Sequence, residues 1–306
     1  MDPQVSIVVS CYNYGGFVAQ CLESIKGQTL SDFEVVVVND GSTDNSEEQI
    51  KLYLSDNRFK YINQRNGGQA KAKNTGLAHA KGKYIAFLDA DDLWEKEKLE
   101  KQVPLFSSNK VGVVYSQARY IDSLGHDLNI KLSGKYLQPK RGYVIDFLII
   151  DNFIPFSSSI VRRDCFDRFG GFDETLKMGI DWDLWLRIST QYKFDFVDQP
   201  LLLYRVGHAG QMSKNVEERQ RCSDRIMKSF IQRYPNHTKK KFLRQAWAYT
   251  YLNRGFYHLD KNMGTALNFY CRAFLMWPFS LKPMIGILKM ARKLISTASQ
   301  GKNCTR

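Results

Sequence analysis

The sequence lacks a long hydrophobic run, a secretory signal and a metal-binding cysteine pattern. Its 306 residues contain no stretch of about eighteen consecutive apolar side chains, so a membrane-spanning helix is not expected. Met1 to Gln4 lead directly into an apolar run, without the basic segment and apolar core of a secretory signal. The six cysteines are scattered without Cys-x-x-Cys spacing, which is typical of reduced thiols in a cytosolic chain. We therefore expect a cytoplasmic protein.

Acidic residues are also scarce in the last third of the chain. Residues 211–306 hold 19 Lys and Arg against 4 Asp and Glu, whereas residues 1–210 hold 25 against 27, so the net charge of +13 belongs to the last third. Strand-like runs end near Gly210, and helical patterns follow at 214–234, 238–258, 262–276 and 281–296. We predict two regions, residues 1–213 and a basic α-helical region at 214–306.

The basic region has two competing explanations. It is either a solvated helical surface or a contact with an anionic membrane surface, which would place the protein at the inner face of the cell membrane. Apolar residues at 276–279 and 285–288 lie among Lys282, Lys289 and Arg292, a combination that suits an interfacial helix. No nucleic acid partner is expected, because no recognised binding motif accompanies the charge.

In the first two thirds, short apolar runs alternate with helical patterns. Valine-rich and other apolar runs predict strands, the first ones buried on both faces, at 5–10, 33–38, 59–62 and 84–88. Helical patterns lie between them at 17–25, 42–54 and 70–80. The alternation predicts an α/β fold with a doubly wound, mostly parallel sheet. Later elements are expected as strands at 111–115, 157–161 and 194–197, and as a helix at 181–189.

Polar clusters follow each of the first four predicted strands. They are 10–14 (SCYNY), 39–44 (NDGSTD), 66–68 (NGG) and 89–92 (DADD). Because ligands bind where the strands of an open α/β sheet deliver their carboxyl ends, the four clusters together predict a nucleotide pocket. Asp40-Gly41-Ser42 alone could equally be a turn with a helix cap. A carboxylate at a buried strand end can instead accept N–H bonds from a nucleobase, and Gly41 permits close backbone approach.

The run Asp89-Ala90-Asp91-Asp92 crowds three carboxylates together. Such crowding is unfavourable unless a cation or a helix N-terminus compensates it. Asp92 has an ordinary explanation as the cap of a helix predicted to begin at Leu93. Asp89 and Asp91 have none, and oxygen ligands beside a phosphate site favour Mg²⁺ or Mn²⁺.

These motifs resemble the family 2 glycosyltransferases, which are inverting enzymes with the GT-A fold. The resemblance covers most of residues 5–213 in order and spacing. Its matching stretches are VSIVVSCYNY from Val5, VVVVNDGSTD from Val35, NGGQAKAKNTG from Asn66, YIAFLDADD from Tyr84, GGFDE from Gly170, DWDLWLR from Asp181 and YRVGHAGQMS from Tyr204.

The resemblance implies a role for several residues. Ser10, Tyr12 and Asp40 would contact the nucleoside of the donor, with Asp40 at the base. Asn66 and Gly68 belong to the polar cluster expected in the same donor pocket.

The remaining acids of the motifs would serve the sugar, the metal and the acceptor. Asp89 would face the ribose or donor sugar and the cation, Asp91 would be the main metal ligand, and Asp181 would be the general base. Two positions depart from the family pattern: Ile180 stands where Glu is common, and Lys73 where Arg is common.

Four further residues have open roles. Asp183 could replace Asp181 as the base, although an exposed or capping acid is its simpler reading. His208 could be an extra cation ligand or a phosphate contact, although a lone histidine in a glycine-rich loop is more often neither. Trp182 could form an apolar wall for the acceptor or pack in the core, and Trp185 is expected to pack in the core.

The sequence therefore predicts a metal-dependent glycosyltransferase. We expect a UDP-linked sugar donor, and a glycan or lipid-linked saccharide acceptor in cell-surface polysaccharide synthesis, the acceptor by family analogy. One alternative is a sugar-1-phosphate nucleotidyltransferase, which usually carries a basic glycine-rich loop after its first strand. Residues 11–16 contain no Lys or Arg. The other alternative, a non-catalytic sugar-nucleotide or glycan-binding module, fits poorly with the presence of all four key aspartates.

Overall fold

The computed structural model describes residues 2–130, 138–208, 210–211 and 215–303, with the side chains of the last helix described through Lys293. The chain divides into two compact units, Met1–Leu148 with Asn152–Tyr234, and Ile149–Asp151 with Pro235–Arg306. The predicted boundary between residues 213 and 214 lies outside the described residues. Helix α8 (Val216–Arg233) belongs to the first unit.

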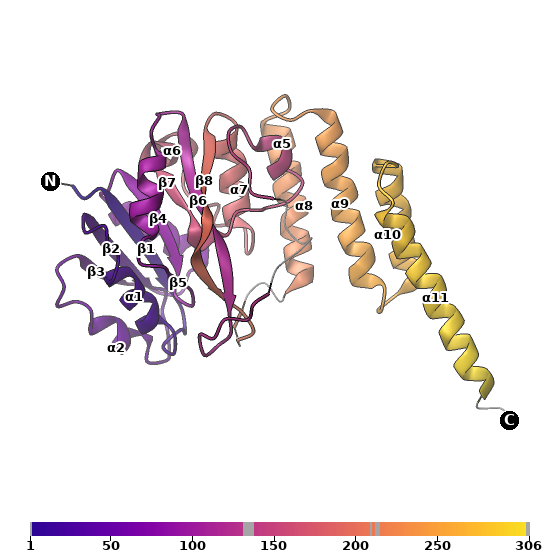
Figure 1. Ribbon diagram of the computed structural model, residues 1–306, viewed down its shortest axis with the longest axis horizontal. Helices are drawn as coiled ribbons and strands as arrows, with labels where there is room; N and C mark the ends of the chain where they lie inside the picture. The colour runs from indigo at the N-terminus through magenta and orange to yellow at the C-terminus, as the bar shows by residue number, and fades with distance from the viewer. Residues whose placement is uncertain (1, 131–137, 209, 212–214, 304–306) are drawn as a thin grey trace. The chain divides into compact units, whose positions relative to one another are not determined.

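The first unit is built on an eight-stranded sheet in the order β3-β2-β1-β4-β7-β6-β8-β5 (Figure 1). Its strands are β1 (Val5–Cys11), β2 (Phe33–Asn39), β3 (Phe59–Asn63), β4 (Tyr84–Asp89), β5 (Leu93–Trp94), β6 (Val111–Ile121), β7 (Ile160–Arg162) and β8 (Lys193–Arg205). Pairing is parallel from β3 to β4 and between β6 and β8, and antiparallel at β7 and β5. The doubly wound, mostly parallel sheet is therefore confirmed.

Helices cover both faces of the parallel part of the sheet. Val35 and Val37 of β2 pack in the cluster that includes α1, whereas Val36 and Val38 pack against Ala72 of α3. Strand side chains alternate between faces, so a run of four buried valines needs cover on both sides. The helices of this unit are α1 (Val18–Lys26), α2 (Ser46–Lys51), α3 (Gln69–His79), α4 (Lys98–Gln102), α5 (Ile145–Leu148), α6 (Arg163–Phe169), α7 (Ile180–Ser189) and α8.

Three expectations for the first unit need correction. Residues 156–158 form a 3-10 turn ahead of β7, so the sixth strand is shorter than predicted. The last strand, β8, is much longer than predicted and runs on to pair with β5. The helix expected at Leu93 begins only at Lys98, because Leu93 and Trp94 pair with Leu203 and Leu202 of β8. Asp92 is therefore not its cap.

The second unit contains the predicted C-terminal helices, α9 (Lys240–His258), α10 (Met263–Met276) and α11 (Lys282–Asn303) (Figure 1). Tyr270 of α10 is fully buried at its centre. A Cβ at Gly255 of α9 or at Gly286 of α11 would lie 2.4 or 2.5 Å from the Tyr270 ring, so glycine lets both helices approach it. Among the described helices, none is long and apolar enough to cross a bilayer.

Candidate functional site

The carboxyl ends of β1 and β4 bring Ser10 and Asp89 side by side. The two residues are register partners in the parallel pair. Lys73 reaches them from α3, its Nζ donating to Ser10 Oγ at 3.0 Å and to Asp89 Oδ1 at 2.8 Å. The lysine is buried while the Asp89 carboxylate remains about one-third exposed, with a side-chain accessibility of 36%. This ion pair fixes one carboxylate oxygen of Asp89 and leaves the side chain accessible to a ligand.

Asp40, at the end of β2, organises the loop that follows β3. Its Oδ1 accepts hydrogen bonds from Gln64 Nε2 at 2.6 Å and Gly67 N at 2.9 Å, and its Oδ2 accepts one from Gly68 N at 2.9 Å. The carboxylate is almost completely buried. Asp40 thus holds the backbone of residues 64–68 at the sheet edge, which places the exposed Asn66 and Gly68 beside the end of β2.

Gly41 allows this loop to approach so closely. Its φ is +73°, and a Cβ at this position would lie 2.8 Å from the Asn66 nitrogen. The sequence motif predicted a close backbone approach at Gly41, and the partner in the structure is the neighbouring loop.

The loop after β1 is joined to the loop after β2. Asn13, at φ +57°, accepts a hydrogen bond from Thr43 N at 2.8 Å, and its own N–H donates to Ser42 Oγ at 2.9 Å. Asp44 accepts a further bond from Gly15 N. Tyr12 is 46% exposed at the tip of this joined pair, so its ring is available to a ligand.

Asp91 is paired with His208. The distance from Asp91 Oδ2 to His208 Nε2 is 2.9 Å, although the two residues lie 117 positions apart. The imidazole is buried, and it packs beside the rings of Tyr14 and Phe17. Burial and then the negative charge of Asp89 raise the pKa of the Asp91 carboxyl above its ordinary value, while His208 acts in the opposite direction. The structure therefore brings the three suggested metal-site residues into one region.

Arg205 and Asp92 hold residues 89–92, which we call the acidic loop, in place. Asp92 Oδ1 accepts a hydrogen bond from Arg205 N at 2.9 Å, and the Arg205 guanidinium donates to the carbonyl oxygen of Asp91 at 2.8 Å. The same guanidinium donates to the carbonyls of Asp122 and Ser123 and to the side chain of Gln20. Both Arg205 and Asp92 are buried. Burial, together with Asp91 and Asp89, raises the pKa of Asp92 well above its ordinary value.

Asp181 is the second residue of helix α7, which begins at Ile180 directly after Gly179. Gly179 has a φ of +73°, which lies in the left-handed region that glycine adopts readily and other residues adopt rarely. Asp181 Oδ2 accepts a hydrogen bond from Asn152 Nδ2 at 2.7 Å. Burial raises the pKa of Asp181, and the charge of Asp89 acts in the same direction, so the two carboxylates lie within electrostatic reach of each other.

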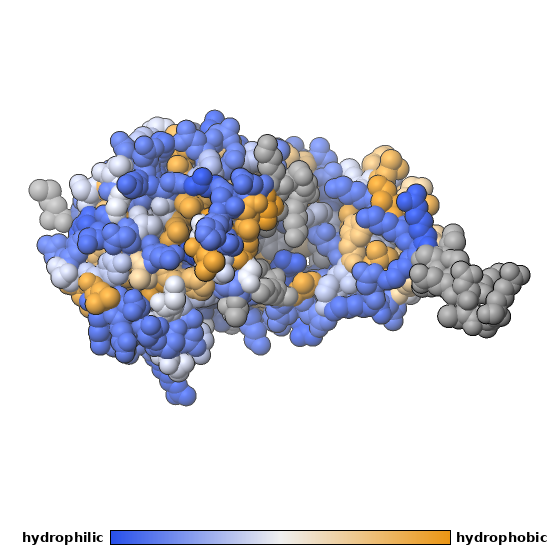
Figure 2. All heavy atoms as spheres, turned by 60° about the horizontal axis from the view of Figure 1, so that its bottom comes forward, coloured by the Kyte–Doolittle hydropathy of each residue, from blue (hydrophilic) through white to orange (hydrophobic). Residues whose placement is uncertain are grey.

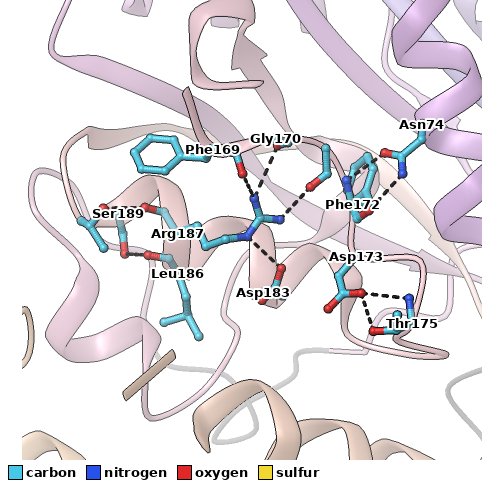
Figure 3. Close-up of polar contacts among 12 residues, drawn as sticks. Asn74, Phe169, Gly170, Phe172, Asp173, Thr175, Asp183, Leu186, Arg187 and Ser189 are labelled. Atoms are coloured by element: carbon cyan, nitrogen blue, oxygen red, sulfur yellow. Dashed lines mark hydrogen bonds and ion pairs between the residues drawn. The ribbon is translucent and has the colours of Figure 1, made fainter. Parts of the chain in front are cut away.

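Asp183 has a different environment from the exposed or capping one expected. Its Oδ2 accepts a hydrogen bond from Arg187 Nε at 2.9 Å, and both side chains are largely buried (Figure 3). Arg187 in turn donates to the carbonyl oxygens of Phe169 and Gly171. The sequence analysis missed this ion pair, which gives Asp183 a structural task in holding the 169–171 turn against α7.

The same turn is connected to α3 through Asn74. Asn74 Oδ1 accepts from Phe172 N at 2.8 Å, and its Nδ2 donates to Phe172 O at 2.9 Å (Figure 3). A Cβ at Gly171 would lie 2.3 Å from Asn74 Oδ1, so only glycine fits there without displacing the amide. Residues 170–173 (GGFD) and residues 72–76 (AKNTG) therefore lie next to each other in the structure.

The two tryptophans of α7 pack inside the protein. Trp185 is fully buried, as predicted, and Trp182 is nearly so, with its indole N–H donating to Leu148 O at 2.7 Å. Core packing, the second of the two roles considered for Trp182, therefore accounts for its position.

The acidic loop could hold a cation together with a bound phosphate. Within the described part of the chain, no group of three or more His, Cys, Asp and Glu side chains is arranged to hold a metal by itself. Asp89 and Asp91 instead offer carboxylate oxygens at the end of β4. Lys73 pairs with Oδ1 of Asp89 and His208 with Oδ2 of Asp91, yet the charge of Asp89 still raises the pKa of Asp91, and a bound cation would offset this repulsion. Mg²⁺ and Mn²⁺ commonly use one or two carboxylates and complete their shell with water and substrate phosphates. The residues present fit such a cation.

Comparisons with known proteins agree with this architecture. The sequence pattern of the family described as Glycosyl transferase family 2 matches residues 6–170, more than half of the chain. An uncharacterized glycosyltransferase of Rickettsia bellii is 33% identical over 205 residues, covering 67% of this chain and 29% of that protein. The chain spans less than two thirds of the length of the first Rickettsia relatives that it matches. The chain belongs to glycosyl transferase family 2.

Two solved structures share the fold. The crystal structure of Staphylococcus aureus TarS 1-349 in complex with UDP-GlcNAc aligns with a TM-score of 0.68 at 18% identity, covering 98% of this chain and 92% of that one. Mannosyltransferase PcManGT from Pyrobaculum calidifontis, in complex with GDP-Man and Mn²⁺, aligns with a TM-score of 0.65 at 19% identity, covering 98% and 81%. At these identities the likeness establishes the fold, which is of the GT-A type.

Proposed function

We propose that the protein transfers a sugar, with inversion, from a nucleoside-diphosphate donor to the hydroxyl of a glycan or lipid-linked saccharide. The observation that carries this proposal is the meeting of Asp40, Asp89 and Asp91 at one sheet edge, with Asp181 within electrostatic reach of Asp89. Family membership favours the transferase over a nucleotidyltransferase, and the presence of every key acid favours it over a non-catalytic module.

We assign donor binding to the ends of β1, β2 and β4. Tyr12 offers an exposed ring to the base, and the loop that Asp40 holds offers the backbone of Asn66 and Gly68. Ser10 and Asp89, joined by Lys73, would face the ribose and donor sugar. A UDP-linked donor is our choice among nucleotides, and TarS and PcManGT are solved with UDP-GlcNAc and GDP-Man respectively.

Asp91 and Asp89 would hold Mn²⁺ or Mg²⁺. When bound, such a cation neutralises the charge of the leaving diphosphate. His208 orients the Asp91 carboxylate through one oxygen, and Arg205 donates a hydrogen bond to the backbone carbonyl oxygen of the same residue. The protein thereby presents the metal-binding carboxylate in one orientation before any ligand arrives.

Asp181 would take the proton of the acceptor hydroxyl. Inverting transfer is a single displacement, in which the hydroxyl attacks the anomeric carbon from the face opposite the diphosphate. A base is needed on the acceptor side, and Asp40, Asp89 and Asp91 serve the donor. Asn152 orients Asp181 by donating to Oδ2 at 2.7 Å. Asp183 is the weaker candidate, because Arg187 already engages its carboxylate.

The test is a pair of measurements on Asp181→Asn. Turnover should fall by about 10²- to 10⁴-fold, the usual effect of losing a general base, because the variant keeps the shape of the side chain and removes its basic oxygen. Calorimetric affinity for UDP in the presence of Mn²⁺ should be retained, because Asp181 acts on the acceptor side. Near-normal turnover in this variant, with a collapse in correctly folded Asp183→Asn, would assign the base to Asp183.

A panel of nucleotide sugars that differ in base and sugar tests the donor. Metal-dependent hydrolysis and protection from thermal unfolding should single out one class of donor. If no nucleotide sugar binds in the presence of Mn²⁺ or Mg²⁺, the transferase proposal is wrong.

A further inference from the structure

The outward face of helix α11 carries a stripe of exposed apolar residues. Pro283, Gly286 and Met290 form its buried face. On the opposite side, exposed apolar residues recur at the spacing of one helical stripe. These residues, which we call the α11 stripe, are Leu281, directly before the helix, and Ile285 and Leu288 within it, with exposed fractions of 70%, 48% and 61%. A surface helix normally turns polar residues outward, so a stripe of this kind is expected to contact another apolar phase or molecule.

The turn between α10 and α11 adds to this exposed apolar surface. Leu275, at the end of α10, is 79% exposed, and Phe279, in the turn, is 82% exposed. Figure 2 shows hydrophobic side chains gathered over the C-terminal helices, with hydrophilic ones beside them. The second unit therefore exposes aromatic and aliphatic side chains that take no part in its own core around Tyr270.

The chain from Lys261 onward carries charged side chains of a single sign. Residues 261–306 contain eight Lys and Arg and no Asp or Glu. Lys282 and Arg292 are exposed on α11, and Arg292 follows Leu288 by four residues, so it continues the line of the stripe. Lys293 is a weaker candidate for an external partner, because its Nζ forms an ion pair with Asp260 at 2.5 Å. Lys289 lies over the ring of Phe256.

We propose that α11 and the α10–α11 turn lie on an anionic lipid bilayer. The α11 stripe and Phe279 would enter the boundary between headgroups and acyl chains, and Lys282 and Arg292 would contact the acidic headgroups. A second copy of the chain would be a poor partner for the same surface, because it would bring the cations beside the two stripes together with no acidic residue of this segment to pair with them. A spanning arrangement does not fit α11, since none of the described helices is apolar enough to cross a membrane. This inference does not depend on the proposed transferase activity.

The test uses the full-length protein and sedimentation with lipid vesicles. One set of vesicles contains phosphatidylcholine alone, and the other contains phosphatidylcholine mixed with phosphatidylglycerol. The protein should sediment with the mixed vesicles at low salt and be released as salt rises, because screening weakens the contact between cations and headgroups. Binding to phosphatidylcholine alone should be much weaker.

Two double variants separate the contributions of charge and apolar contact. Lys282→Gln with Arg292→Gln should weaken binding to the mixed vesicles roughly 30-fold, since each cation near the surface contributes about fivefold. Leu281→Gln with Leu288→Gln should weaken binding at least about tenfold without any change of charge. The matched control is Lys26→Gln with Lys110→Gln, two exposed lysines of the first unit, which should bind like the unchanged protein.

Circular dichroism must show unchanged helix content for each variant before its binding is compared. Equal binding of all three variants, or equal binding to both kinds of vesicle, would overturn the proposal. A dimer in sedimentation velocity that dissociates in Leu281→Gln with Leu288→Gln would also overturn it, because a second copy would then cover the stripe. Donor hydrolysis without vesicles is measured separately and should be the same in all three variants.

Discussion

The imidazole of His208 contacts Asp91 at 2.9 Å, between segments that lie 117 residues apart in the chain. Tyr14 and Phe17 pack beside the ring, so the histidine has a fixed position behind the carboxylate. One oxygen of Asp91 is thereby engaged by the protein. The arrangement gives the acidic loop a defined geometry.

Removing the Asp91 carboxylate should abolish metal-dependent turnover. Asp91→Asn keeps the size of the side chain and loses the charge that would hold the cation, so donor hydrolysis should fall by at least about 10²-fold. EDTA should have the same effect on the unchanged protein, and added Mn²⁺ or Mg²⁺ should reverse it. Asp167→Asn, which changes an exposed acid on α6, is the control and should keep normal activity. Full activity in EDTA would show that Asp91 holds no essential metal.

The pH dependence of turnover should report the protonation of Asp181. Burial raises its pKa above the ordinary value, and the hydrogen bond from Asn152 lowers it. A general base must be deprotonated, so turnover should rise with pH through the raised pKa. Asn152→Ala removes the bond that favours the carboxylate, so its rise should move to higher pH while donor affinity stays unchanged. An unchanged pH profile in Asn152→Ala would show that this asparagine does not act on the base.

The same pKa shift has a consequence for stability. Because the carboxyl of Asp181 has a higher pKa in the folded than in the unfolded protein, the folded state holds this proton more tightly. This group therefore makes the free energy of unfolding decrease as pH rises from the ordinary aspartate pKa through the raised one. Asp181→Asn cannot ionise and should show a smaller decrease over that interval. Urea denaturation of both proteins across the interval provides the measurement, with equal pH dependence as the contrary result.

Loss of Arg205 should destabilise the first unit strongly. Arg205→Ala leaves partly buried carbonyl oxygens of Asp91, Asp122 and Ser123 without their donor and removes the charge beside buried Asp92. Removing one partner of a buried charged network typically costs about 3–5 kcal/mol. Arg119 also forms ion pairs, but it is exposed, so Arg119→Ala should cost about 1 kcal/mol or less. Urea unfolding of the two variants gives the comparison, and similar costs would contradict the anchoring role of Arg205.

The loop that Asp40 holds should not tolerate a side chain at Gly41. Gly41→Ala adds a Cβ that would lie 2.8 Å from the Asn66 nitrogen, at a φ that alanine disfavours. We expect a loss of about 1–3 kcal/mol in unfolding free energy and a weaker affinity for UDP with Mn²⁺, because residues 64–68 must move. At Gly16 a Cβ would meet nothing within 4 Å, so Gly16→Ala is the matched control. Calorimetry should show normal UDP affinity for Gly16→Ala, and equal losses in both variants would count against the loop contact.

Local sequence predicted much of the sheet and the placement of most candidate residues. The valines of β2 are buried on both faces as their run predicted, and Ser10, Asp40 and Asp89 lie at the strand ends where an α/β sheet gathers its ligands. These features depend on side-chain periodicity and on residues next to one another in the chain. A single sequence carries such information directly.

Other parts of the site were decided by contacts between distant segments. Leu93 and Trp94 lie in a helix-like sequence, but pairing with β8 makes them a strand. Lys73, Asn152 and Arg205 were given no specific contact by the sequence, because each acquires its role from a partner on another element. Asp183 was likewise expected to be an exposed or capping acid, but in the structure it forms a buried ion pair with Arg187. The sequence by itself determined which acids stand at the strand ends; the tertiary structure decided what holds them, since hydrogen bonds between elements depend on packing rather than on local pattern.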